Sequence, residues 1–150
     1  MRIIEGSVYE LLCESCHATV PHFVFSGDTD MATEGLLSAG SNVTKDVAIF
    51  EASSDEFLKT GYDLDKAAAR LPKLFGRNDL HLVRYLMSEN EFVPKSGTFR
   101  NFRERYKPPV PVYACPCCVN GQMRPTGIFE PAEFIKAGGR ILFSENLTLR

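Results

Sequence analysis

Two pairs of cysteines with the same spacing constrain this 150-residue chain more than any other feature of its sequence. The first pair lies in C-E-S-C at residues 13–16 and the second in C-P-C-C at residues 115–118. This spacing lets one tight turn present two thiolates to the same tetrahedral ion, and two such turns supply four ligands. We therefore predict one structural Zn²⁺ per chain. The predicted ligands are Cys13, Cys16, Cys115 and Cys118.

The separation of the two pairs limits the fold. Because 98 residues lie between them, two distant parts of the chain must return to one place in space. Each pair follows an extended apolar segment, which predicts two related β-hairpins at about residues 8–25 and 110–129. We expect one α+β domain over residues 1–150, in which a small antiparallel sheet carries both zinc-knuckle hairpins. A helical insert at about residues 53–107 is expected to connect them.

Further strands are expected where β-branched and aromatic residues gather between turn signals. The strands predicted in this way are 2–12, 18–25, 46–52, 122–128, 140–143 and 147–149. Residues 26–45 are rich in Gly, Ser, Thr and Asn, a composition typical of a long surface loop.

Helices are predicted from capping residues and apolar periodicity. Ser53 with Glu56 three residues later forms a capping box, which predicts a brief helix ended by Gly61. Asp63 predicts the start of a second helix, whose apolar residues recur at helical spacing before Pro72 and Gly76 disturb it. A third helix is expected from Asp79 because Leu80, Val83, Leu86 and Met87 would share one side, and a last helix is expected from Pro131 to Gly138-Gly139.

Other side chains compete with the predicted ligands. Cys117 occupies the middle of its turn and is expected to be a spare thiol, although it can take the place of Cys118 because C-P-C also supplies two thiolates. His17 and His22 are alternative ligands, since imidazole also binds zinc. His81 is expected to have a structural role beside its leucine neighbours.

The two cysteine turns, C-E-S-C-H and C-P-C-C-V, resemble the knuckles of the zinc-ribbon and rubredoxin-like group. Pro116 matches the proline that usually follows the first cysteine of such a knuckle. His17 and Val119 depart from the group's pattern, which favours a small residue after the last cysteine. The resemblance covers about 20 residues around each pair and implies the same four cysteine ligands.

Charge is distributed unevenly along a chain whose formal net charge is −2. Residues 1–50 carry two basic and seven acidic side chains, whereas residues 95–150 carry nine and four. An acidic surface from the first third would suit a basic protein partner through charge complementarity. No long apolar run or apolar leader is present, so we expect no membrane association and a cytoplasmic location.

A basic aromatic stretch at residues 99–107 supports a rival function. In it Phe99, Phe102 and Tyr106 alternate with four cationic side chains that would hold phosphates while the rings stack on bases. The candidate nucleic-acid contacts are Arg100, Arg103, Arg105 and Lys107. The simpler interpretation is an amphipathic helix whose aromatic side packs on the core.

Enzyme motifs are missing from the sequence, including the phosphate-binding loop, the dinucleotide fingerprint, the H-E-x-x-H zinc motif and the nucleophile elbow. A closed four-thiolate site also has no open position for substrate. We therefore expect a non-enzymatic, zinc-stabilised protein-interaction module, such as an adaptor, an inhibitor or an immunity-type protein. The alternative is a zinc-ribbon nucleic-acid-binding protein, and the third hypothesis is a thiol redox or iron electron-transfer protein.

Overall fold

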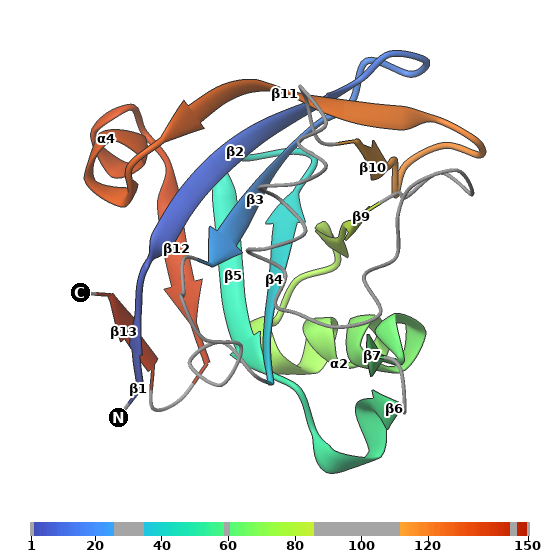
Figure 1. Cartoon of the computed structure of the whole chain (residues 1–150), viewed down its shortest axis with the longest axis vertical. Helices are drawn as coiled ribbons and strands as arrows, with labels where there is room; N and C mark the ends of the chain where they lie inside the picture. Colours follow the sequence, from blue (N-terminus) through green and yellow to red (C-terminus); the bar gives the residue numbers. More distant parts are fainter. Residues whose placement is uncertain (1, 26–34, 59–60, 86–111, 145–146, 150) are drawn as a thin grey trace, which may run out of the picture.

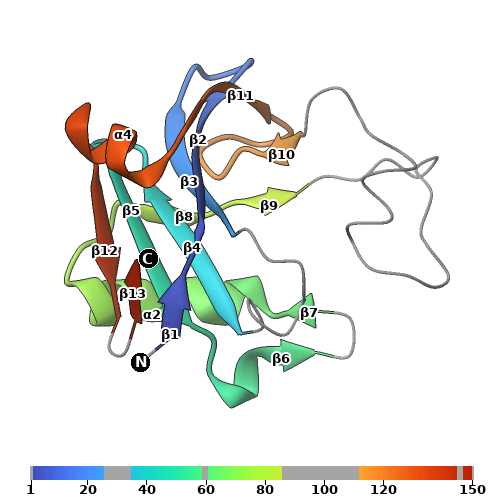
Figure 2. The same cartoon turned by 60° about the vertical axis from the view of Figure 1, so that its left-hand side comes forward.

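The computed structural model describes residues 2–25, 35–58, 61–85, 112–144 and 147–149. Within these ranges the chain has an α+β fold made mostly of strands, with two α-helices (Figure 1). The larger of its sheets is antiparallel throughout and curled, and a second, mixed sheet packs against it (Figure 2).

The larger sheet has the strand order β3-β2-β11-β10-β9. Its strands are β2 (Gly6–Cys13), β3 (Thr19–Phe25), β9 (Arg84–Tyr85), β10 (Tyr113–Ala114) and β11 (Gln122–Phe129). The long strand β11 pairs with both β2 and β10, so that Met123 lies opposite Cys13 on one side and opposite Tyr113 on the other. Through β11, the sheet brings together the parts of the chain that carry the two cysteine pairs.

The second sheet has the order β12-β5-β4-β8 and is covered on both faces. Its strands are β4 (Leu36–Ser41), β5 (Asp46–Glu51), β8 (Leu80–Leu82) and β12 (Arg140–Phe143). Leu36, Val47 and Ile49 pack toward β2 and β3, whereas their neighbours Leu37 and Phe50 pack toward helix α2. Contacts on both faces explain why every residue of β4 is buried.

Helix α2 (Leu64–Phe75) forms the third layer, against the four-stranded sheet (Figures 1 and 2). The predicted cap is present, because the Asp63 carboxylate accepts the backbone N–H of Lys66 at 3.1 Å. Gly76 ends the helix in the left-handed region at φ 68°, as a C-terminal glycine commonly does. Ala67 and Leu71 face the sheet and are buried. The second predicted helix is therefore confirmed.

The remaining elements are short. They are β1 (Arg2–Ile4), the 3-10 helix η1 (Ser54–Glu56), β6 (Phe57–Leu58), β7 (Gly61–Tyr62), α4 (Pro131–Lys136) and β13 (Leu147–Leu149). Strands β1 and β13 pair in parallel, which places the first and last strands of the described chain side by side (Figure 1). Helix α4 begins at the predicted proline, and Phe134 anchors it in the core.

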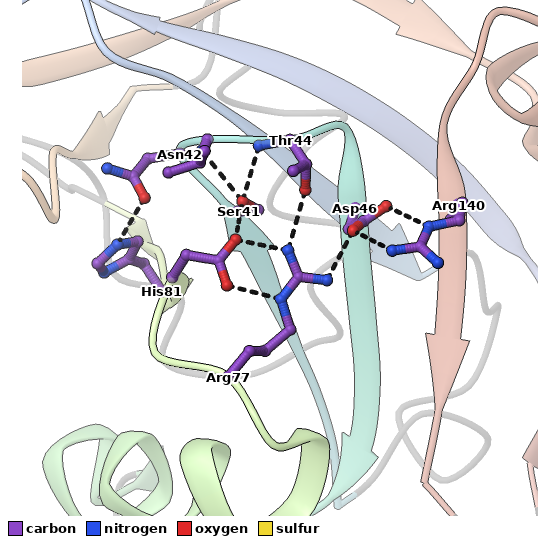
Figure 3. A network of polar contacts seen from close by, with 9 residues as sticks. Ser41, Asn42, Thr44, Asp46, Arg77, His81 and Arg140 are labelled. Carbon is purple, nitrogen blue, oxygen red and sulfur yellow. Dashed lines mark hydrogen bonds and ion pairs between the residues drawn. The ribbon is translucent and has the colours of Figure 1, made fainter.

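A polar network joins the β4–β5 connection, the segment after α2 and strand β12 (Figure 3). The Arg77 guanidinium donates to Asp46 at 2.6 Å and to Asp79 at 2.6 Å. Arg140 donates to both carboxylate oxygens of Asp46, at 2.9 and 2.7 Å. Hydrogen bonds from Arg140 and Arg77 hold the pKa of the Asp46 carboxyl well below its usual range, although burial opposes this. Ser41 completes the network by donating to Asp79.

Two predicted features are wrong. The predicted loop at 26–45 contains β4, and its small residues are required by packing: a Cβ on Gly40 would lie 1.8 Å from the Pro21 carbonyl oxygen. The third helix is replaced by strands β8 and β9, because Leu80 joins the ladder beside β4 and Asp79 binds Arg77 and Ser41 instead of capping a helix. The predicted insert therefore holds one α-helix among its described residues.

Other expectations are confirmed or corrected in detail. Strands occur in all six predicted segments, but β12 and β13 make parallel pairs instead of extending an antiparallel sheet. The capping box is formed, since the Ser53 N–H donates to Glu56 at 2.9 Å, yet η1 lasts only three residues and Gly61 begins a strand. Residues 26–34 and 86–111 lie outside the described part of the chain.

Candidate metal centre

The four predicted ligands come together at one end of the curled sheet. Their Sγ atoms all lie within 4.8 Å of one another. Cys13 and Cys118 are 3.6 Å apart at sulfur, and Cys16 and Cys115 are 3.7 Å apart. Four sulfurs bound at about 2.3 Å to a tetrahedral ion would be separated by about 3.8 Å. Two of the sulfur–sulfur distances therefore match this value, and each of them joins one turn to the other. The spacing of the four cysteines is compatible with a bound metal ion.

The first turn connects β2 to β3 and points backbone N–H groups at its leading sulfur. The amides of Ser15 and Cys16 each approach Cys13 Sγ at 3.4 Å. The Cys13 N–H donates to the Ala18 carbonyl at 2.9 Å, and His17 adopts φ 62° to close the turn. The hydrogen bond from the Cys16 amide is the largest influence on Cys13, and it lowers the pKa of that thiol to about 6. This arrangement favours a thiolate at Cys13.

The second turn lies between β10 and β11 and is built in the same way. The Cys117 amide donates to Cys115 Sγ at 3.3 Å, and the Cys115 amide donates to the Gly121 carbonyl at 2.9 Å. Asn120 adopts φ 63° at the end of the turn. Burial raises the pKa of the Cys115 thiol to about 12, so without a cation this sulfur keeps its proton.

Gly121 allows the two turns to meet. A Cβ at this position would lie 2.4 Å from Cys118 Sγ and 2.8 Å from Cys13 Sγ, so any larger residue would displace the sulfurs. The adjacent Gln122 carbonyl accepts the Glu14 N–H at 3.1 Å, which ties the first turn to β11. Asn-Gly is a common turn signal in a sequence, and it gives no indication of this close approach between the two turns.

The cluster has a buried side and an exposed side. Cys13 and Cys115 are 0% and 8% exposed and belong to the core, together with Leu11 and Met123. Cys16 is exposed and Cys118 is half-buried. An ion held here would therefore be anchored from the core side and reached from solvent through the other two sulfurs.

Cys117 lies beside this cluster without belonging to it. It is exposed and falls outside the set of four mutually close sulfurs. Partial burial raises the pKa of its thiol, as does the nearby Cys16, while hydrogen bonds with the Cys115 and Asn42 side chains oppose the shift. The position agrees with the expectation that Cys117 is not one of the four resident ligands.

None of the three histidines joins the sulfur cluster. The His22 ring lies edge-on to Tyr113, with 5.2 Å between centroids, and its Nδ1 is buried with no hydrogen-bond partner among the described residues. Burial lowers the pKa of His22 to about 4, which keeps the ring neutral near pH 7. His81 is a strand residue whose Nε2 lies 3.1 Å from Asn42 Oδ1.

The candidate nucleic-acid contacts cannot be placed relative to this centre. Arg100, Arg103, Arg105 and Lys107 all lie outside the residues that the structure describes. Within the described ranges, no helix has the length and apolar character needed to cross a membrane.

No protein-family model, no curated protein and no solved structure matches this chain.

Proposed function

We propose that this protein is a non-enzymatic, zinc-stabilised protein-interaction domain. Two zinc-knuckle hairpins would hold one Zn²⁺ through Cys13, Cys16, Cys115 and Cys118. The observation that carries this proposal is the approach of four sulfurs to within 4.8 Å of one another across 98 intervening residues. The N–H groups directed at Cys13 and Cys115 add the charge compensation that thiolate ligands need.

The donor set favours zinc in a structural role. Four thiolates in tetrahedral arrangement suit Zn²⁺ or iron, and a closed set of four leaves no coordination position for substrate. When bound, the ion would supply a cross-link between the turns and no catalytic chemistry. Iron in the same ligands would instead support electron transfer, which is the third hypothesis.

A basic protein partner is proposed from the charge of the first third of the chain. Glu5 and Glu14 are exposed on the described surface of residues 1–50. Glu14 is paired with Arg124 at 2.6 Å and Glu10 lies 4.0 Å from Lys45, so part of this acidic charge is compensated within the protein. Isolation of the protein under native conditions should yield a specific partner that dissociates at high salt, since exposed ion pairs are screened by salt. Recovery of the protein alone would count against this part of the proposal.

Nucleic-acid binding is the second candidate, and the basic aromatic stretch at 99–107 is the observation in its favour. It predicts binding to RNA or DNA with a steep salt dependence, lost when Arg100, Arg103 and Arg105 are changed to Glu. Absence of binding at low salt would reject it.

Metal analysis tests the proposal as a whole. Protein purified without chelator or added metal should contain about one zinc per chain, and thiol titration under native conditions should detect one accessible thiol, that of Cys117. Stoichiometric iron would favour electron transfer. Absence of metal with five reactive thiols would overturn the proposed centre.

A further inference from the structure

The four sulfurs of the candidate metal centre make two close contacts, and each contact joins one cysteine turn to the other. We propose that oxidation converts this centre into two disulfide bonds across the turns, Cys13–Cys118 and Cys16–Cys115, with release of the metal ion. The disulfides keep the two turns joined, so the centre responds to an oxidant without loss of the fold. This inference rests on the proposed function, because it requires zinc at the four cysteines.

The sulfur contacts define one complete pairing. Cys13 Sγ lies 3.6 Å from Cys118 Sγ, and Cys16 Sγ lies 3.7 Å from Cys115 Sγ. Each sulfur takes part in one contact, and the paired cysteines are 105 and 99 positions apart in the chain. The sulfurs of a disulfide are about 2.0 Å apart, so each pair needs to approach by about 1.6 Å. This is a side-chain movement between turns that β11 already joins by pairing with β2 and β10.

Backbone amides lie on the side of the core sulfurs that faces their own turn. The N–H groups of Ser15 and Cys16 approach Cys13 Sγ at 3.4 Å each, and that of Cys117 approaches Cys115 Sγ at 3.3 Å. A disulfide within a turn would form on the side where these amides lie, whereas a disulfide across the turns leaves them in place. The arrangement therefore favours bonds between the turns.

Each contact combines a sulfur that solvent reaches with one that it does not. Cys16 is exposed and Cys118 is half-buried, whereas Cys13 and Cys115 are 0% and 8% exposed. Peroxides oxidise an accessible cysteine to a sulfenic acid, which then condenses with a neighbouring cysteine to a disulfide. Cys16 and Cys118 are thus the sulfurs that the oxidant attacks, and their core partners complete the two bonds.

Hydrogen peroxide is the oxidant that balances this step. For each disulfide, two sulfurs together lose two electrons as the S–S bond forms and their bonds to the ion break. One hydrogen peroxide accepts the two electrons, takes up two protons from the solvent and leaves as two water molecules. Two peroxides therefore convert four thiolates into two disulfides and release one Zn²⁺, whose oxidation state does not change.

The test uses the Cys117→Ser protein purified with its zinc, in which the four cysteines of the centre are the only thiols. About two equivalents of hydrogen peroxide should release about one zinc per chain, measured with the chromogenic chelator 4-(2-pyridylazo)resorcinol. The wild type is the control. It should release zinc with the same stoichiometry and keep one reactive thiol, that of Cys117.

Mass spectrometry without reduction should identify the bonds. Proteolytic cleavage after Glu14 separates Cys13 from Cys16. Each of these two cysteines should then be bonded to the peptide that contains Cys115 and Cys118. Fragment spectra of that peptide should assign Cys13 to Cys118 and Cys16 to Cys115.

Thermal unfolding adds a readout that does not depend on peptides. The oxidised, zinc-free chain should unfold at least about 10 °C above the reduced, zinc-free chain, because a bond between distant residues strongly restricts the unfolded state. Disulfides within the turns close very short loops and would give a much smaller shift. Reduction of the oxidised chain should restore binding of about one zinc.

The outcomes separate this inference from the proposed function. If the protein contains about one zinc before treatment, then disulfides within the turns, bonds between molecules or zinc release without disulfides would overturn the inference and leave the metal centre intact. Retention of zinc after treatment would do the same. Absence of zinc before treatment would overturn both proposals.

Discussion

The two ends of the molecule are held together by different means. At the metal end, around Leu11, Val20 and Met123, two of the seven buried core residues are cysteines. At the helix end, α2 and the four-stranded sheet enclose Phe50, Leu71 and five other apolar residues. Among the described residues, seven partly buried hydrophobic side chains pack against the cluster at the helix end, whereas two pack against the cluster at the metal end. A metal cross-link at the four cysteines would compensate for this smaller apolar burial at the metal end of the fold.

Removal of a metal ligand should give the largest effect. Cys13→Ser should lower the free energy of unfolding by more than about 5 kcal/mol, because zinc-binding energy in structural sites is also folding energy. Thermal unfolding followed by circular dichroism would measure this loss, and excess chelator should reproduce it in the wild type. Cys117→Ser should unfold like the wild type. If Cys13→Ser were as stable as Cys117→Ser, the metal end would not depend on an ion.

The polar network around the start of β5 should be weakened without loss of metal by Asp46→Asn. The Asp46 side chain is 4% exposed and compensates two guanidinium groups, so we expect a loss of about 3–4 kcal/mol. Zinc content should stay at one per chain. Lys45→Ala, at an exposed neighbour 4.0 Å from Glu10, should cost almost nothing in urea unfolding. Loss of zinc in Asp46→Asn would show that the two ends are coupled.

Acid should destabilise the protein through His22. Its pKa is lowered to about 4 in the folded chain from 6.5, so the unfolded chain takes up a proton first as the pH falls. His22 should therefore leave the free energy of unfolding unchanged above pH 6.5 and lower it by about 3 kcal/mol by pH 4. Unfolding of wild type and His22→Gln between pH 7 and pH 4 would isolate the effect, since protonation of the thiolates is common to both. Parallel pH profiles would contradict it.

The smallest predicted effect concerns the contact between the turns. Gly121→Ala should weaken zinc binding about tenfold, or about 1.4 kcal/mol, because its Cβ would push on Cys118 and Cys13. Competition with a chelator of known affinity would measure the change, with Gln122→Ala, an exposed neighbour, as control. Equal affinities would show that the sulfurs can move aside without cost.

The sequence was informative where local chemistry decides the structure. Cysteine spacing identified the four clustered sulfurs, and the Asp63 cap located the start of α2, which continues through Pro72 to Phe75. These signals act within a few residues and do not depend on the rest of the fold.

Prediction failed where tertiary packing decides. Leu36–Ser41 has the composition of a loop, but its small residues are required because the strand is buried on both faces. The buried Ser38 hydroxyl accepts a hydrogen bond from the Phe23 N–H at 3.0 Å. Leu80 and Val83 have helical spacing, but pairing with β4 makes this segment a strand. The contact of Gly121 with both turns depends on the pairing of β2 with β11, which the chain's local pattern does not reveal.

The long separation between the two cysteine turns determines the order in which strand pairing and metal binding can occur. Each turn alone offers two thiolates and can hold an ion only weakly. All four ligands exist together only after residue 118 has been synthesised and β11 has paired with β2. Tight metal binding would therefore follow the pairing of β2 with β11, and the metal content of a preparation would report how many molecules have completed this pairing.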